Sequence, residues 1–546
     1  MFCDKPHVNQ LTYLLKAQGF EDIVVCPGSR NGILVHNFNE AHFRLHPVTD
    51  ERSAAFVALG LCLSTQRPIA ICVTSGSALL NTIPAVAEAY YRQLPLLVIS
   101  ADRPKQWINQ LDGQTLQQVG ALQPYAQTFN IEEPHTPEEE HWNALRINEA
   151  LLSLQHNGHQ PVHINVPITE PLFTFNTKEL PAATCIEEEM PRHEHPIAAE
   201  TMARIQQAQF PVIVMGQYEK GAIACIEKIN KNGALLVLPE IISGQPYAWR
   251  TTALEHLLPN DEFEPDLVIH IGGNLVNKQL KLQLRKLQHC EVIRIDNSKN
   301  LPDTFGHLKT IVRTTPEAAL AQLSELTVSN PNVEKYKLWL DRYEKVAMDY
   351  VPTHFSDIGL LQQLSKLWPK DCALQSGNSS VIRNVAYFFD KQADRLFCNR
   401  GVNGIEGSLS AAVGYAMGYT GLTFSLIGDL SFFYDQNALW DTQLPKGLRI
   451  VLFNNGGGQI FYRLPGLNQT PALDPYIAAS HQTSAKGLAE SYGLTYLSAN
   501  DYETAGAAFQ KLMERHQERP MLLEVFTQTT DNENELKQIK QYYKNL

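Results

Sequence analysis

Two neighbouring stretches of the chain decide its fold: LTFSLIGDLSFFYDQNALW at 422–440 and LRIVLFNNGGGQIF at 448–461. Each begins with an apolar run of strand length and ends in a polar turn, Gly428-Asp429 in the first and Asn454-Asn455-Gly456-Gly457-Gly458 in the second. A helical stretch separates the two runs, so we expect parallel strands in an open sheet. Because parallel strands end at the same edge of a sheet, Asp429 and Asn455 are expected to converge there.

The residue types in these turns suit a magnesium ion. A carboxylate, a side-chain amide oxygen and a free backbone carbonyl are hard oxygen donors, and Mg²⁺ takes its remaining ligands from phosphate oxygens and water. The glycines at 456–458 would let the backbone approach a diphosphate closely and expose N–H groups to it. Taken alone, each turn is better explained by an aspartate that caps a helix or by an Asn-Gly turn. The combination favours a magnesium diphosphate site.

Strands and helices alternate along the whole chain, which predicts an α/β protein with parallel sheets covered on both faces. The expected strands lie at 22–26, 69–73, 96–100, 211–215, 234–238, 267–271, 291–295, 372–375, 422–427, 448–453 and 521–526. The expected helices lie at 33–38, 77–92, 379–389, 408–417 and 504–516. The stretch 175–197 has no periodicity and is typical of a linker, and 324–337 supplies the next break. We therefore expect three successive doubly wound parallel-sheet domains at 1–178, 198–330 and 345–546.

The charge balance narrows the range of partners. The 546 residues include 57 acidic and 45 basic side chains, for a net charge of −12, which disfavours binding to nucleic acid and to anionic membranes. An anionic substrate would therefore need a local group of arginines. The nine cysteines form no C-x-x-C pair, and no apolar run reaches the roughly 18–20 residues that span a bilayer. With no basic and apolar leader at the N-terminus, these features predict a soluble, cytoplasmic protein.

The pairing of G-D-x with N-N one helix later resembles the fingerprint of thiamin diphosphate enzymes, a group that includes transketolase and the pyruvate-decarboxylating enzymes. The third residue of that pattern is usually Gly, whereas this chain has Leu430. The resemblance implies three domains of the thiamin diphosphate-binding type. In chain order they would be a pyrimidine-binding domain, a central α/β domain and a domain that binds the diphosphate and the metal.

A second element of such enzymes is a glutamate that shares a proton with the aminopyrimidine ring of the cofactor. HPVTDERSAAFVALG at 46–60 places Glu51 just after a short predicted strand and at the start of an apolar helix. This position matches the family's glutamate, which lies at a subunit interface. Taken alone, Asp50 and Glu51 are better explained as acidic residues that favour the positive end of a helix.

Eight turns narrow the resemblance to one branch of these enzymes, the 2-succinyl-5-enolpyruvyl-6-hydroxy-3-cyclohexene-1-carboxylate synthases of menaquinone biosynthesis. The turns are CPGSRNG (26–32), TDER (49–52), TSGSALLN (74–81), ADRP (101–104), GNSSVIR (377–383), NRGVNGIEG (399–407), GDLSFFYDQNAL (428–439) and NNGGGQIF (454–461). The likeness runs from about residue 9 to the C-terminus and is thin in the middle third.

The resemblance assigns roles to individual positions. Catalytic roles fall on Glu51 and Gln114. The metal would be held by Asp429, Asn455 and the carbonyl of Gly457, and Ile405 would support the bent cofactor. The full set implied for the cofactor is Glu51, Ile405, Gly428, Asp429, Leu430, Ser431, Asn455, Gly457, Gly458, Gln459 and Ile460.

Two anionic substrates are implied, 2-oxoglutarate and isochorismate. The family decarboxylates 2-oxoglutarate and adds the resulting carbanion to isochorismate in a 1,4-addition, and guanidinium groups suit the carboxylates of both. Ser379, Arg383 and Arg400 are expected mainly at the ketoacid. Ser29, Arg30, Arg103 and Lys278 are expected nearer isochorismate, with Phe461 and Leu464 as an apolar wall. The family tends to have Lys-Arg where this chain has Lys278-Gln279, so one positive charge is missing there.

Several alternatives stay open on the sequence alone. Mn²⁺ could replace Mg²⁺, and the family analogy implies a homodimer or homotetramer with sites between subunits. The chain could instead be another thiamin-dependent carboligase, similar to acetohydroxyacid synthase, or a cofactor-binding paralogue without catalysis. Against the first, the middle third has no G-x-G-x-x-G and the arginine set suits polycarboxylates better than pyruvate. A paralogue without catalysis is disfavoured because the chain retains Glu51, a residue that serves activation of the cofactor and not its binding.

Overall fold

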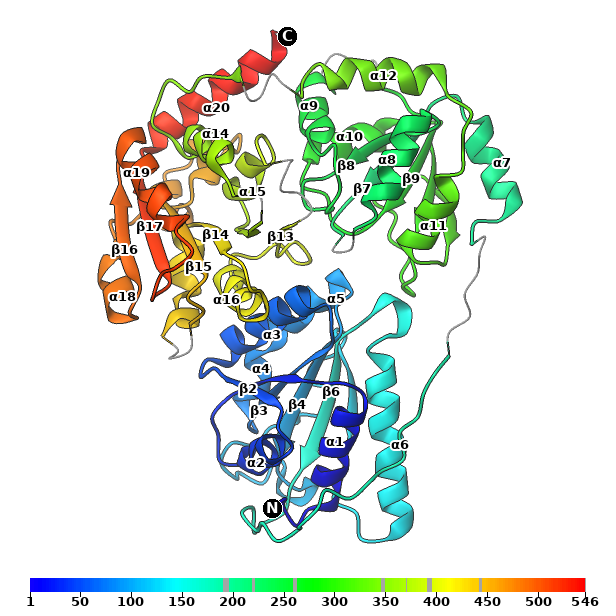
Figure 1. Cartoon of the computed structure of the whole chain (residues 1–546), viewed down its shortest axis with the longest axis vertical. Coiled ribbons are helices and arrows are strands. Elements are labelled where there is room, and N and C mark those ends of the chain that lie inside the picture. Colours follow the sequence, from blue (N-terminus) through cyan, green and yellow to red (C-terminus); the bar gives the residue numbers. More distant parts are fainter. Residues whose placement is uncertain are drawn as a thin grey trace. The chain divides into compact units, whose positions relative to one another are not determined.

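The computed structural model of the chain describes residues 1–189, 196–218, 221–258, 263–344, 349–369, 371–389, 395–440 and 444–545 (Figure 1). The chain forms two compact units. The first consists of Met1–Pro191, Glu406–Thr420 and Asp435–Pro445, and the second of Arg192–Ile405, Gly421–Tyr434 and Lys446–Leu546. The region predicted as a third domain, 345–546, therefore contributes segments to both units.

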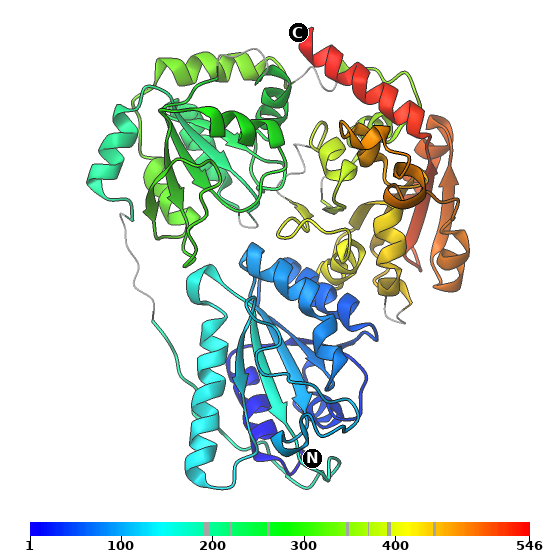
Figure 2. The same ribbon diagram turned by 180° about the vertical axis from the view of Figure 1, so that it is seen from behind.

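The first unit contains a six-stranded parallel sheet with the order β2-β1-β3-β4-β6-β5. Its strands are β1 (Asp22–Val25), β2 (Arg44–Pro47), β3 (Ile69–Val73), β4 (Leu96–Asp102), β5 (Gln127–Asn130) and β6 (Val162–Pro167). Buried apolar side chains of three helices pack with those of the strands: α1 (Pro6–Ala17), α2 (Gly32–Glu40) and α6 (Pro137–Ser153). The cyan helix in Figure 2 is α6.

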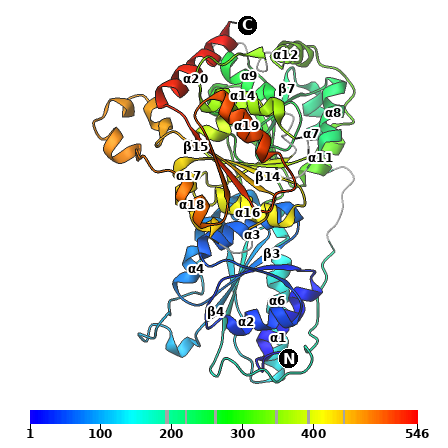
Figure 3. The same ribbon diagram turned by 60° about the vertical axis from the view of Figure 1, so that its left-hand side comes forward.

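Two helices of the first unit pack backbone to backbone, α3 (Glu51–Thr65) and α16 (Ser408–Gly418), and they lie side by side in Figures 1 and 3. A Cβ atom on Gly60 would overlap the carbonyl oxygen of Ala411, and one on Gly414 would overlap the carbonyl oxygen of Val57. Only glycine permits such a close approach. Through this contact α16, which comes from the last third of the sequence, packs as part of the first unit.

The helix expected at 77–92 is two helices, α4 (Ser77–Asn81) and α5 (Ile83–Arg92). Pro84 lies in the first turn of α5, where its missing N–H costs no hydrogen bond, whereas the interior of one long helix would need that donor. The break at Thr82 is the physical consequence.

The second unit contains two parallel sheets. The central sheet has the order β11-β10-β9-β7-β8 and comprises β7 (Pro211–Met215), β8 (Leu236–Pro239), β9 (Leu267–Ile271), β10 (Glu291–Ile295) and β11 (Leu308–Val312). Side chains of β7 alternate between two cores, with Val212 and Val214 in one and Ile213 and Met215 in the other. Helices with buried side chains in these cores are α7 (Ala199–Gln207), α8 (Ile223–Asn232), α9 (Trp249–Leu257), α10 (Lys278–Lys286), α11 (Pro316–Leu323) and α12 (Pro331–Asp341).

The other sheet of this unit has the order β13-β12-β14-β15-β17-β16. Its strands are β12 (Ala373–Ser376), β13 (Leu396–Cys398), β14 (Thr423–Gly428), β15 (Leu448–Asn454), β16 (Thr495–Ala499) and β17 (Met521–Phe526). Its helices are α14 (Asp357–Leu367), α15 (Ser380–Val385), α17 (Asp429–Tyr434), α18 (Lys486–Ser491), α19 (Tyr502–Leu512) and α20 (Thr529–Lys544).

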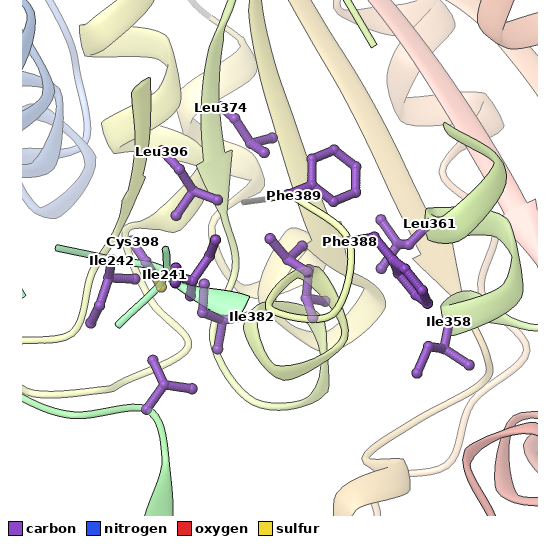
Figure 4. Packing of buried hydrophobic residues seen from close by; sticks show 14 of the residues in the cluster. Ile241, Ile242, Ile358, Leu361, Leu374, Ile382, Phe388, Phe389, Leu396 and Cys398 are labelled. Carbon is purple, nitrogen blue, oxygen red and sulfur yellow. The ribbon is translucent and has the colours of Figure 1, made fainter. Parts of the chain in front are cut away.

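One apolar core joins the two sheets of the second unit. Figure 4 shows Ile241 and Ile242, which follow β8, near Cys398 of β13 and Ile382 of α15. Leu361 of α14 belongs to the same cluster. The central and last sheets are therefore parts of one packed body.

The predicted fold class of three parallel-sheet α/β domains is confirmed. The expected helix at 379–389 is shorter, α15 (Ser380–Val385), and the one at 504–516 begins earlier, at Tyr502, because Asp501 caps it through the N–H of Thr504. Residues 190–195 of the predicted linker lie outside the described residues. Within the described ranges, no helix combines the length and apolar character that crossing a membrane requires.

Candidate active site

The two polar turns of the fold-deciding stretches meet at the carboxyl ends of β14 and β15 (Figure 3), which pair in parallel. Asp429 is the first residue of α17, and its Oδ2 accepts the backbone N–H groups of Asn455, Gly456 and Gly457 at 3.1, 2.8 and 3.0 Å. Its Oδ1 accepts the N–H of Leu430 at 2.6 Å. The predicted convergence of Asp429 and Asn455 is confirmed.

The environment of Asp429 favours a cation beside it. The residue is only 3 % exposed. Burial raises the pKa of Asp429, while the backbone N–H of Leu430 and the charge of His481 oppose that shift. His481 Nε2 lies 3.3 Å from Asp429 Oδ2, close enough for an ion pair when the imidazole is protonated. Sequence reasoning missed this histidine because it comes from a loop far along the chain.

The glycines have a structural role that the sequence did not reveal. Gly456 and Gly457 have φ values of 81° and 145°, which side-chain-bearing residues rarely adopt. A Cβ on Gly457 would lie 2.8 Å from the carbonyl oxygen of Ala478, which accepts the N–H of Gly458 at 2.7 Å. The N–H groups of 455–457 bond to Asp429, instead of facing outward as we expected.

Replacing Gly457 with Ala should therefore lower stability, by about 1–3 kcal/mol for the strained backbone. Gly466→Ala is the matched control because Gly466 also has a positive φ, 86°, but has no atom within 4 Å of its added Cβ. The midpoint of urea unfolding should fall more for Gly457→Ala than for Gly466→Ala. Equal shifts would mean that the contact with Ala478 contributes nothing.

Asn455 presents an oxygen without a partner. Its Nδ2 donates to Oδ2 of Asp357 at 3.1 Å. Its Oδ1 is buried and accepts no hydrogen bond from any described residue. A buried acceptor without a donor is unfavourable unless a cation or water satisfies it. Together with Asp429, this oxygen fits a hard metal ion.

The carbonyl of Gly457 completes the predicted donor set. It accepts the N–H of Gln459 at 3.0 Å, and a carbonyl oxygen has a second lone pair for a metal. No group of three or more His, Cys, Asp or Glu that could hold a metal occurs in the described part of the chain. The proposed donor set differs from such clusters, because it combines one carboxylate, one side-chain amide and one backbone carbonyl.

The other predicted cofactor positions of the second unit lie near this edge. Ser431 is buried, and its hydroxyl donates to the carbonyl of Ile405, whose side chain is 39 % exposed. Gln459 is buried, whereas Ile460 is half-buried. The remaining predicted positions at this edge are Gly428, Leu430 and Gly458.

Phe461 and Leu464 differ in their surroundings. A Cβ on Gly458 would come within 2.7 Å of the Phe461 ring, so this ring lies against the glycine loop. Leu464 is 42 % exposed. Phe461 therefore borders the edge where the metal donors meet, and Leu464 is available to an outside molecule.

Arg400 is a buried arginine with unused donor capacity. Its Nη1 donates to Asn378 Oδ1 at 3.3 Å and its Nη2 to the carbonyl of Leu275 at 3.4 Å. Its Nε is buried and has no hydrogen-bond partner among the described residues. The Asn274 side chain holds the same loop by donating to the carbonyl of Gly401 at 3.0 Å. This guanidinium keeps an N–H donor that an anion could accept.

Arg383 and Ser379 lie together, because an Nη of Arg383 donates to the carbonyl of Ser379. Arg383 is exposed, yet loss of hydration around its guanidinium and the charge of Arg400 lower its pKa, and Glu255 opposes that shift. The two arginines expected at the ketoacid are thus near enough to repel each other. A dicarboxylate between them would relieve that repulsion.

Lys278 begins α10, and its side chain is exposed. The lysine one turn later, Lys281, is half-buried and lies within electrostatic reach of Arg400. Partial burial and the charge of Arg285 lower the pKa of Lys281, and Arg400 acts in the same direction. Sequence reasoning missed Lys281, although a spacing of three residues on a helix would have placed it on the same face as Lys278.

In the first unit, Arg30 and Arg103 share one carboxylate. Arg30 is 5 % exposed, and its Nη2 lies 3.1 Å from Glu170 Oε1. Arg103 Nη1 lies 4.0 Å from the same oxygen and 2.9 Å from Asp112 Oδ2. Glu170 is 70 % exposed and so could give way to a carboxylate from solution. Sequence reasoning found both arginines and missed Glu170.

Two other predicted residues of this unit are exposed, Ser29 and Gln114. Gln114 has a φ of 55°, and its backbone lies 3.2 Å from where a Cβ on Gly76 would be. The neighbouring Gln118 is buried and accepts the N–H of Gly76 at 2.7 Å. This bond fixes the loop that presents Gln114.

Glu51 is half-buried at the first position of α3. Its Oε2 accepts Nδ2 of Asn81 at 3.1 Å. Asp50 is the N-cap and accepts the N–H groups of Arg52 and Ser53. The capping role therefore belongs to Asp50, and the Glu51 carboxyl can serve another purpose.

Known proteins similar to this chain cover both regions that contribute candidate site residues. Residues 7–124 match the family model described as thiamine pyrophosphate enzyme, N-terminal TPP binding domain, and residues 376–525 match the corresponding C-terminal TPP binding domain. A 2-succinyl-5-enolpyruvyl-6-hydroxy-3-cyclohexene-1-carboxylate synthase from Phocaeicola vulgatus is 39% identical, with 100% of this chain and 99% of the relative covered. The enzyme of the same name from Flavobacterium johnsoniae is 36% identical, with coverage of 98% and 97%.

Solved structures share the fold. The benzoylformate decarboxylase from Polynucleobacter necessarius superimposes with a TM-score of 0.76 at 16% identity, covering 97% of this chain and 99% of that one. At this identity the likeness concerns the arrangement of sheets and helices alone.

Proposed function

Because the chain belongs to the 2-succinyl-5-enolpyruvyl-6-hydroxy-3-cyclohexene-1-carboxylate synthase family of thiamine pyrophosphate enzymes, we propose that it is the carboligase-type transferase of menaquinone biosynthesis. The reaction decarboxylates 2-oxoglutarate and adds the remaining four-carbon unit to isochorismate in a 1,4-addition. The products are CO₂ and 2-succinyl-5-enolpyruvyl-6-hydroxy-3-cyclohexene-1-carboxylate. The cofactors are thiamin diphosphate and Mg²⁺, and Mn²⁺ would suit the same oxygen donors.

One observation supports the metal site above the others. The buried Oδ1 of Asn455 has no partner among the described residues, and the turn that carries Asn455 is bound to the buried carboxylate of Asp429. Both belong to the region that matches the C-terminal TPP binding domain. Asp429, Asn455 and the carbonyl of Gly457 would hold the metal on the diphosphate.

When bound, thiamin diphosphate supplies a carbon nucleophile and a sink for the electron pair that decarboxylation leaves. The Glu51 carboxyl would hold a proton on the aminopyrimidine ring, and Asn81 orients that carboxyl through Oε2. Gln114 would lie near the substrate, on the loop that Gln118 fixes.

The arginines would bind the carboxylates of the substrates. Arg400 and Arg383, with Ser379, would take those of 2-oxoglutarate, since Arg400 keeps a free N–H donor at Nε. Arg30 and Arg103 would take those of isochorismate by displacing Glu170. Lys278, Phe461 and Leu464 would complete the second substrate's surroundings.

Product analysis tests the proposed reaction. The chain, thiamin diphosphate and Mg²⁺ are mixed with 2-oxoglutarate and isochorismate, and the product is identified by mass spectrometry. Pyruvate replaces 2-oxoglutarate in a parallel sample. Turnover of pyruvate alone would favour a carboligase similar to acetohydroxyacid synthase, and no turnover with correctly folded protein would favour a non-catalytic paralogue.

Arg383→Ala should raise the KM for 2-oxoglutarate by about 10–100-fold, because a charge-assisted hydrogen bond contributes about 1.5–3 kcal/mol. The KM for isochorismate should change much less. Arg515→Ala is the control, since this exposed arginine pairs with Asp371 in the same unit. Steady-state kinetics with each substrate varied in turn measure both effects. An unchanged KM for 2-oxoglutarate would remove Arg383 from the site.

A further inference from the structure

A buried polar network stands behind Asn455. Asp357, at the first position of α14, is 5 % exposed, and its Oδ1 accepts the Thr527 hydroxyl at 2.7 Å while its Oδ2 accepts Asn455 Nδ2 at 3.1 Å. Its backbone N–H donates to Asn532 Oδ1 at 2.7 Å. Each oxygen of this carboxylate therefore has a defined donor.

The network fixes the direction of its amides. Since Asn532 Oδ1 accepts the N–H of Asp357, its Nδ2 must point elsewhere, and it donates to Gln459 Oε1 at 3.1 Å and to the Thr527 hydroxyl oxygen at 3.0 Å. Gln459 in turn donates to the Thr529 hydroxyl at 3.3 Å. A flip of either amide would set two donors or two acceptors against each other.

The same reasoning applies to Asn455. An ionised carboxylate can only accept hydrogen bonds, so Asp357 binds the nitrogen end of the Asn455 amide and not the oxygen end. The oxygen end is therefore turned to the opposite side, where it is buried and has no partner among the described residues. The backbone of the same turn is bound to the Asp429 carboxylate through the N–H groups of Asn455, Gly456 and Gly457.

We propose that Asp357 is a positioning residue that selects the orientation of Asn455 in which the amide oxygen, and not the amide nitrogen, faces the metal. The inference rests on the proposed function, because it assumes a metal at Asp429 and Asn455. Asp357 acts through Asn455, whose Nδ2 it holds by a hydrogen bond. Outer partners of metal ligands are typically worth about 10–100-fold in metal affinity.

The test is a double-mutant cycle on metal affinity. Mg²⁺ is titrated into the full chain with thiamin diphosphate, and cofactor binding is read by calorimetry, without any turnover. Asp357→Asn should weaken Mg²⁺ by about 10–100-fold, because the new amide can donate to Asn455 Oδ1 and stabilise the reversed orientation. That orientation presents N–H groups to the cation.

In an Asn455→Asp background, Asp357→Asn should have the opposite effect on Mg²⁺ affinity. In Asn455→Asp, either carboxylate oxygen serves the metal, but Asp357 now repels the new carboxylate across the former hydrogen bond. Adding Asp357→Asn in this background replaces repulsion by an N–H donor, so Mg²⁺ should bind more tightly than in Asn455→Asp alone. A role of Asp357 in folding alone would lower the affinity in both backgrounds, and that result would overturn the inference.

The controls separate the possible failures. Glu535→Gln removes another buried carboxylate of this unit, one bonded to Thr353 and His354, and should leave Mg²⁺ affinity unchanged. If Asp357→Asn does not fold, Thr527→Val removes one donor to Asp357 and should weaken Mg²⁺ several-fold; no change would contradict the inference. If Asp429→Asn leaves Mg²⁺ affinity unchanged, the proposed metal site fails, whatever Asp357 does.

Discussion

Replacing Glu51 with Gln is expected to lower kcat by about 10²–10⁴-fold, the usual contribution of a positioned acid or base, while thiamin diphosphate affinity stays within a few-fold. The amide of Gln can still accept the hydrogen bond from Asn81 Nδ2, so the side chain keeps its place on α3. It cannot share a proton with the aminopyrimidine ring. Single-turnover kinetics with saturating cofactor, together with calorimetric titration of thiamin diphosphate, separate the two effects.

Asp50→Asn is the matched control for this variant. Asp50 is the adjacent carboxylate and caps α3, and Asn caps helices about as well as Asp. Its turnover should therefore stay near that of the native chain. If Glu51→Gln retained full turnover, the proposed proton-sharing role would be wrong, and a loss shared equally by both variants would indicate damage to the helix terminus.

Asp429→Asn is expected to weaken Mg²⁺-dependent binding of thiamin diphosphate by at least about 100-fold, because changing a ligand should cost more than the about 10–100-fold that outer partners of ligands contribute. The substitution removes the negative charge but keeps an oxygen that can accept the N–H groups of the glycine loop. Cofactor affinity is measured after EDTA treatment and again with added Mg²⁺. In the native chain, metal removal should produce the same loss.

Asp474→Asn provides the control for charge in the same unit, because Asp474 is exposed and bonded only to Tyr462 in the contacts described. It should leave the Mg²⁺ dependence unchanged. Unaltered cofactor affinity in Asp429→Asn would contradict the metal assignment.

Mixing the two inactive variants tests whether sites form between subunits. If Glu51 of one copy serves the metal site of another, a mixed dimer of Glu51→Gln and Asp429→Asn has one intact site, and random pairing restores about a quarter of native activity. If each site lies within one copy, every site carries a substitution and no activity returns.

The strands that the sequence revealed include those with uninterrupted apolar runs, such as β3 and β7, whose predicted bounds match the structure. The strand β6 went unnoticed because it reads VHINVP, with polar residues at alternate positions. His163 and Asn165 are nevertheless fully buried, since the Ser100 hydroxyl bonds to both. Whether a polar residue can be buried depends on partners from other strands, which a single strand's sequence does not contain.

In the candidate site, too, some residues could be predicted from local sequence and others could not. Asp429 and Asn455 could be predicted because each follows an apolar strand, and parallel topology then brings them together. The role of Asp357 could not be predicted from the sequence, because Ser356-Asp357 at the start of a helix ordinarily indicates a helix cap. Ser356 does cap α14, by accepting the N–H of Gly359. The contact with Asn455 depends on how α14 packs in the second unit, which no local pattern encodes.

The glycine-mediated pairing of α3 with α16 bears on synthesis of the chain. The first unit draws on Met1–Pro191 and on two segments that end at Pro445. At about 5–20 residues per second, the ribosome needs roughly 10–50 s to supply the missing segments. Throughout that interval α16 is not yet available to cover the face of α3 around Gly60. A chaperone that protects the nascent chain would therefore have to shield this face.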